Sequence, residues 1–97
     1  IGEDHIDGQV LRVDRFGNLI TNVDRRTFEK LAHSPLEIRI GKHQVSRVVS
    51  TYADAAAGEI CALFGSTDHL EVAANGASAA ARLDLGRGAP VHVARRA

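Results

Sequence analysis

The stretch that decides the fold is Val13-Asp14-Arg15-Phe16-Gly17-Asn18-Leu19-Ile20-Thr21-Asn22. It joins two extended segments, Ile6 to Asp14 and Leu19 to Asn22, in which apolar β-branched residues are interleaved with polar ones. Gly17 can take a positive φ without steric cost, so a tight turn or a bulge is expected between the two segments. Such a turn presents the side chains that flank the glycine on one side of the chain.

Alternation of apolar and polar residues continues beyond this stretch. Leu36 to Ile40 and His43 to Ser50 alternate on either side of Gly41-Lys42, which predicts a hairpin; two unpaired strands are the alternative. Further expected elements are strands at Glu59 to Phe64, His69 to Ala73 and Pro90 to Val93, and a short helix from Asp24 to Leu31. The stretch Asn75 to Leu83 predicts a helix entry followed by one or two turns of helix. The pattern predicts a mainly β fold, a small antiparallel barrel of six or seven strands with one or two short helices.

Length and charge exclude several classes of protein. The 97 residues suffice for a single domain, residues 1–97, and are too few for two. Twelve Lys and Arg residues balance twelve Asp and Glu residues, so no net charge attracts nucleic acid. No apolar run approaches the length that spans a bilayer, so no membrane is expected. The sequence contains no methionine, and we expect it to be part of a longer protein.

Cysteine and histidine usage gives no sign of a metal or a disulfide framework. Cys61, the single cysteine, lies in an apolar run and is expected to be a small buried hydrophobe in a reducing, cytoplasmic setting. The histidines lie far apart and without metal-ligand spacing, at His5, His33, His43, His69 and His92. We expect neither a metal nor another cofactor.

The glycine turn also concentrates chemistry suited to a polar ligand that carries a flat ring. Asp14 can pair with a cationic amine, Phe16 offers an apolar face, and Asn18 carries a donor and an acceptor for a purine edge. The alternative is that Asp14 and Asn18 only satisfy backbone groups of the turn, which both residue types do often. Spacing alone does not separate the two interpretations.

The residues Asp14 to Asn22 reproduce in full the "Asp-Arg-Phe-Gly-Asn-Leu-Ile-Thr-Asn" turn of the S-adenosylmethionine (SAM) hydroxide adenosyltransferases, and the chain resembles the carboxy-terminal domain of that family. The family also includes the enzymes that fluorinate and chlorinate the same substrate. Other family motifs follow in order as Thr51-Tyr52, Gly65-Ser66, Leu70-Glu71-Val72-Ala73 and Asn75-Gly76-Ala77-Ser78-Ala79.

The resemblance assigns substrate contacts residue by residue. It implies that Asp14 holds the methionine ammonium, that Asn18 reads the adenine edge, and that Phe16 and Tyr52 pack against the base. The remaining implied contacts are Ser66 and Thr67 at the amino-acid end, the backbone near Asn75 and Gly76 at adenine, and Glu71 on its strand. The turn departs from the family pattern at Gly65 and Asp68, where the family has Asn and Gly. Thr67 stands where the halogenating relatives have arginine, which favours the branch that uses water.

The resemblance also implies a reaction and partners. SAM, as substrate and not as cofactor, would be hydrolysed to adenosine and L-methionine between the amino-terminal domain of one subunit and the carboxy-terminal domain of its neighbour in a homotrimer. The catalytic residues would lie in the amino-terminal domain, so this chain alone is expected to be inactive. The alternatives are a SAM-dependent halogenase domain and a non-catalytic barrel that binds RNA or a protein, for which a basic face rich in aromatic residues would be expected.

Overall fold

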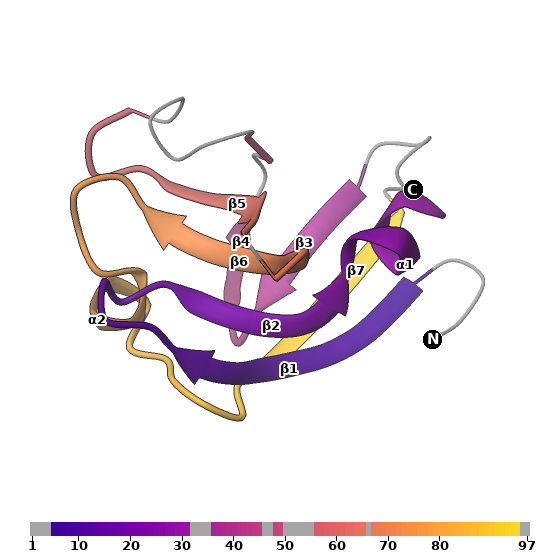
Figure 1. Cartoon of the computed structure of the whole chain (residues 1–97), viewed down its shortest axis with the longest axis horizontal. Helices are drawn as coiled ribbons and strands as arrows, with labels where there is room; N and C mark the ends of the chain where they lie inside the picture. The colour runs from indigo at the N-terminus through magenta and orange to yellow at the C-terminus, as the bar shows by residue number, and fades with distance from the viewer. Residues whose placement is uncertain (1–4, 32–35, 46–47, 50–55, 66, 96–97) are drawn as a thin grey trace.

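In the computed structural model, residues 5–31, 36–45, 48–49, 56–65 and 67–95 are described. These residues form seven antiparallel strands in a nearly closed barrel and two short helices (Figure 1). The strands are β1 His5–Val13, β2 Leu19–Asp24, β3 Leu36–Ile40, β4 His43–Val45, β5 Ile60–Phe64, β6 His69–Ala74 and β7 Pro90–Arg95. The helices are α1 Arg25–Glu29 and α2 Ala79–Leu83. The expected mainly β class and the barrel are confirmed.

The strands follow the order β4-β3-β7-β1-β2-β6-β5 in one continuous sheet. The expected hairpin is confirmed, because β3 and β4 pair with Ile38 opposite Val45. Beyond β4, Val48 forms a parallel bridge to Ala62 of β5, and the Val49 amide donates to the Ala62 carbonyl over 2.8 Å. This contact brings the two ends of the sheet together. In Figure 1, β7, β3 and β4 pass behind β1, β2 and β6.

Alternating side chains fill the barrel interior. Along β1, Ile6 and Val10 are buried while Leu11 remains exposed, as the sequence pattern predicts. In β5 the run Cys61 to Leu63 is buried without alternation, because Val49 and Ala73 cover one face and the barrel core covers the other. Cys61 is fully buried among these apolar neighbours, which confirms its predicted role as a small hydrophobe.

Two polar residues of the deciding stretch repair interruptions in the strand pairing. The register shifts between Val10 and Arg12 in the β1–β2 pair and between Ile20 and Asp24 in the β2–β6 pair. At the second shift the fully buried Thr21 hydroxyl donates to the Leu70 carbonyl (2.7 Å) and accepts from the Val23 amide (3.1 Å). Near the first, Oδ1 of Asn22 accepts from the Gln9 amide over 2.9 Å. Backbone groups are thereby satisfied at both shifts, in the buried interior at Thr21 and on the exposed side at Asn22.

Both helices begin at a side-chain cap. Asp24 accepts from the Thr27 amide over 2.7 Å, as predicted, but α1 ends at Glu29 and not at Leu31. The predicted helix entry at Asn75, followed by one or two helical turns to Leu83, is confirmed. Residues 75–77 form a turn after β6, and α2 begins at Ala79 behind its cap Ser78. No helix of the described residues is long and apolar enough to cross a membrane.

Candidate functional site

The turn between β1 and β2 is organised by the Asp14 carboxylate. Its Oδ1 accepts hydrogen bonds from the backbone amides of Phe16 (2.9 Å) and Asn18 (3.0 Å). The Asp14 amide in turn donates to the Asn18 carbonyl, and Gly17 has a φ of 85°. One oxygen of Asp14 therefore satisfies backbone amides of the turn, which was one of the two interpretations of this residue from the sequence. Its second oxygen has no hydrogen-bond partner among the described residues.

The start of α2 holds this turn from the other side. The Ala80 amide donates to the Gly17 carbonyl over 2.9 Å, and Ser78 lies directly against the Gly17 α-carbon. A β-carbon at position 17 would lie 2.0 Å from the Ser78 hydroxyl oxygen and 2.8 Å from its α-carbon. Position 17 therefore requires glycine both for its backbone conformation and for this close approach. The turn and the segment that leads into α2 form one packed unit.

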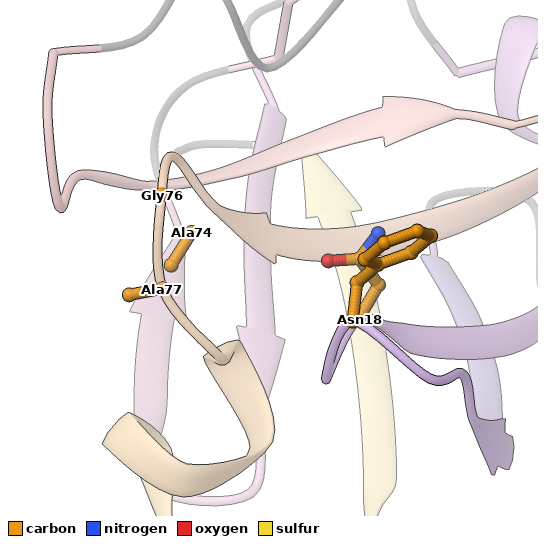
Figure 2. Close-up of a pocket in the computed structure, with 5 residues that line it drawn as sticks. Asn18, Ala74, Gly76 and Ala77 are labelled. Atoms are coloured by element: carbon orange, nitrogen blue, oxygen red, sulfur yellow. The ribbon is translucent and has the colours of Figure 1, made fainter.

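A pocket of about 320 Å³ opens between the turn and the β6–α2 loop. Its lining consists of Phe16, Asn18, Ala74, Gly76 and Ala77. Figure 2 shows Asn18 on one side of the pocket, with Ala74 at the end of β6 and the loop residues Gly76 and Ala77 on the opposite side. The two sides come from segments that are far apart in the sequence and are joined by the contact of Gly17 with α2.

The lining suits a flat heterocycle. Phe16 is 65% exposed, so its ring face is available for stacking. Asn18 is only 6% exposed, yet its side-chain amide makes no hydrogen bond to any described residue. Gly76 has a φ of 76°, and no described residue beyond its chain neighbours has an atom within 4 Å of where a β-carbon would stand, so a ligand can approach its backbone. The Asn18 side-chain amide therefore opens onto the pocket without a partner among the described residues, and a polar edge of a ligand can pair with it there.

The other sequence-predicted residues lie around this pocket and not in its lining. The Asn75 backbone bonds to residues 58 and 59, with its amide donating to the Glu59 carbonyl and its carbonyl accepting from Gly58. Thr67 is exposed in the turn between β5 and β6, where its carbonyl contacts the His69 ring at 2.9 Å. Tyr52 and Ser66 lie outside the described residues.

Glu71 lies on β6, half-buried, with its carboxylate against the Gly65 α-carbon. A β-carbon at Gly65 would overlap Oε2 of Glu71, at a separation of 1.6 Å. Burial raises the pKa of the Glu71 carboxyl above its ordinary value of 4.5, and the neighbouring charge of Asp14 raises it further, whereas Arg12 lowers it. Two carboxylates thus lie close enough to influence one another beside the turn, an arrangement that favours a cation.

The pKa of Glu71 predicts a pH-dependent cost to stability. An acid with a raised folded-state pKa binds protons more tightly in the folded protein, so stability falls as the pH rises through the unfolded and then the folded pKa. The variant Glu71→Gln should therefore gain stability relative to the parent as the pH rises above the ordinary carboxyl pKa of 4.5. Thermal unfolding at a series of pH values measures the difference, with Glu29→Gln on α1 as the matched control. A difference that is constant or shrinks with pH would contradict the assigned cause.

Sequence reasoning missed three residues on which the site depends. Ala74 and Ala77 line the pocket, and Ser78 sets the position of the turn. The small-residue run around Gly76 was the available signal, because small residues allow backbone segments to approach closely. No group of three or more His, Cys, Asp or Glu residues that could hold a metal ion occurs in the part of the chain that the structure describes.

Comparisons with known proteins place the chain beside proteins with the same architecture. The family model for the SAM hydroxide adenosyltransferase C-terminal domain matches residues 8–92. A crystal structure of an uncharacterized conserved protein from Thermotoga maritima matches with a TM-score of 0.79 and 28% identity, over 90% of this chain and 35% of that one. A conserved hypothetical protein from Thermus thermophilus matches with a TM-score of 0.71 and 36% identity, over 90% of this chain and 34% of that one.

No curated protein matches the chain. The chain spans about a third of the length of the two solved structures.

Proposed function

This chain belongs to the family of SAM hydroxide adenosyltransferase C-terminal domains, and from that premise we propose that the Phe16–Asn18 pocket binds the adenine of SAM. The observation that carries the proposal is the Asn18 side chain, which is nearly buried and unpaired among the described residues and faces a cavity beside an exposed aromatic ring. A purine supplies both missing interactions, a face for Phe16 and a donor–acceptor edge for Asn18.

The pocket is matched to part of a ligand and not to all of SAM. Its volume of about 320 Å³ lies at the lower end of the range for small-molecule sites, which run from roughly 300 to 1,000 Å³. We assign it to the base, with Gly76 and Ala77 providing the wall opposite Phe16. The remainder of the substrate would extend out of the pocket toward surfaces that this domain supplies only in part.

The cationic end of the substrate is assigned to the acidic side of the turn. Asp14 keeps one carboxylate oxygen for the backbone and has a second for the methionine ammonium. Glu71 lies near Asp14 on the next strand but one and adds negative charge to the same region. The roles of Tyr52, Ser66 and Thr67 at the base and the amino-acid end stay predictions.

We further propose that the whole protein transfers the adenosyl group to water. An oxygen–carbon bond forms at the carbon that joins ribose to sulfur, and the carbon–sulfur bond breaks with its electron pair moving to sulfur. Adenosine and L-methionine result, and the proton of the attacking water passes to a base in the rest of a longer protein. This domain would contribute by fixing the adenosyl group so that the nucleophile attacks in line with the sulfonium.

The direct test of the adenine assignment is the variant Asn18→Ala. Loss of the amide should leave the purine edge unpaired and weaken adenosine binding by about 1 to 3 kcal/mol, which is roughly a 5- to 150-fold increase in Kd. Isothermal titration calorimetry with adenosine measures the change, and circular dichroism checks that the variant is folded.

The matched control is Gln44→Ala, which removes an exposed amide on β4 and should leave the Kd unchanged. A folded Asn18→Ala variant with the parent's affinity would remove Asn18 from the site.

A further inference from the structure

A second hollow, larger than the adenine pocket, lies between the β3–β4 turn and the end of α2. Its volume is about 730 Å³. Its lining consists of Gly41, Lys42, His43, Arg82, Leu83, Asp84, Leu85 and Pro90, none of which lines the adenine pocket. We propose that this groove binds a small organic anion, a phosphate or carboxylate group attached to an apolar body. The proposal is independent of the adenine assignment.

The two walls of the groove are fixed to each other. The Gly41 amide donates to the Pro90 carbonyl over 2.9 Å, and a β-carbon on Gly41 would lie 2.8 Å from the Leu85 side chain. From the same wall as Gly41, Nε2 of His43 lies 3.1 Å from the Leu83 carbonyl at the end of α2, the distance of a hydrogen bond. These contacts join segments that are about forty residues apart, so the groove is part of the folded architecture.

Each wall supplies one cation. Lys42 projects from the β3–β4 turn and makes no hydrogen bond or ion pair with any described residue. Arg82, on α2, donates through Nη1 to the Gly58 carbonyl over 2.7 Å, which holds its guanidinium in place with further N–H groups remaining. A guanidinium that is already oriented loses less entropy when it binds an anion.

The other lining groups define the class of ligand more closely. Asp84 brings one negative charge, so Lys42 and Arg82 leave one excess positive charge when His43 is neutral. Leu83, Leu85 and Pro90 add an apolar surface beside the cations. An inorganic ion would pair with the cations and leave the apolar surface exposed to solvent. An organic anion with an aromatic or aliphatic body would pair with the cations and also bury the apolar surface.

The test titrates phenyl phosphate and benzoate into the ¹⁵N-labelled chain and follows amide chemical shifts. Saturable shifts are expected at residues 41–43 and 82–85, with dissociation constants of about millimolar order for ligands this small. Two further ligands separate the contributions of charge and of apolar contact to the affinity. Inorganic phosphate lacks the apolar body, and benzyl alcohol lacks the charge. Both should bind at least about fivefold more weakly, a difference of about 1 kcal/mol.

Substitutions of the two cationic side chains test which of them binds the anion. Lys42→Ala should weaken phenyl phosphate binding at least about fivefold, and Arg82→Gln should do the same. Lys30→Ala, which removes a cation just after α1, is the matched control and should have no effect. Because the Lys42 side chain bonds no described residue, Lys42→Ala keeps the test decisive if Arg82→Gln unfolds.

Three results would overturn the proposal: no saturation, equal binding of inorganic phosphate, or parent affinity in folded Lys42→Ala. Adenosine titrated into the same samples reports separately on residues 16–18 and 74–77.

Discussion

Replacement of Gly17 by alanine is expected to lower the free energy of unfolding by about 3 kcal/mol. Two costs add at this position. A φ of 85° is unfavourable for any residue that has a β-carbon, at about 1 kcal/mol or more. The new β-carbon would also lie 2.8 Å from the Ser78 α-carbon, so backbone and not only a side chain must move, at about 1 to 3 kcal/mol.

The chain contains a matched control for the first of these costs. Gly88 has a φ of 91°, close to that of Gly17, but apart from its chain neighbours no described residue has an atom within 4 Å of the position that its β-carbon would take. Gly88→Ala should therefore show the conformational cost alone, about 1 kcal/mol. Urea unfolding of both variants measures the difference that the Ser78 contact contributes.

A second variant tests the same contact from the opposite side. Ser78→Gly removes the two closest atoms, so Gly17→Ala should cost less in that background than in the parent. Equal costs for Gly17→Ala and Gly88→Ala would show that the turn is not packed against α2. The two sides of the pocket would then not be joined by the contact between Gly17 and Ser78.

Thr21→Val is expected to lower the free energy of unfolding by about 2 to 6 kcal/mol although the side chain keeps its shape. The hydroxyl is fully buried and bonds two backbone groups, the Leu70 carbonyl and the Val23 amide. Valine leaves both groups buried at the point where β2 and β6 shift register and cannot bond each other. Each unsatisfied group costs about 1 to 3 kcal/mol.

Thr27→Val is the control for this substitution, because Thr27 is half-buried on α1 and its hydroxyl bonds the exposed Asp24 carboxylate, so its loss leaves no buried backbone group without a partner. Chemical denaturation should show that Thr27→Val lowers the free energy of unfolding much less than Thr21→Val does. Similar losses in the two variants would mean that the Thr21 hydroxyl does not replace the missing ladder bonds.

The sequence was sufficient for most of the fold because its signals are local. Apolar alternation in Leu36–Ile40 and Ile6–Val10, together with glycines at turns, predicts where strands run and how β3 and β4 pair. The end of α1 was predicted two residues too late, since apolar Leu31 packs into the core without continuing the helix. The apolar pattern is the same whether Leu31 is buried as part of the helix or just after its end.

The candidate site was predicted in part. The turn residues Phe16 and Asn18 and the loop residue Gly76 do meet at one pocket, whereas Asp14 uses one oxygen to hold the turn and Thr21 and Asn22 serve the strand pairing. The sequence of a motif does not show whether a polar side chain faces a ligand or a backbone amide. Only the folded register separates these roles.

Long-range features were beyond the sequence. Ala74 and Ala77 carry no chemistry of their own, and they line the pocket only because the β6–α2 loop lies opposite the turn. The groove at Lys42 and Arg82 likewise depends on the meeting of distant segments through His43 and Leu83. No local pattern specifies such a meeting.

A crystal structure of the chain grown with saturating adenosine would show directly whether the base occupies the Phe16–Asn18 pocket. We expect a purine stacked on the Phe16 ring, with the Asn18 side-chain amide within hydrogen-bond distance of its edge and the Gly76 loop on the opposite face. Adenosine bound elsewhere, or bound here with the Asn18 amide turned away from the base, would contradict this expectation.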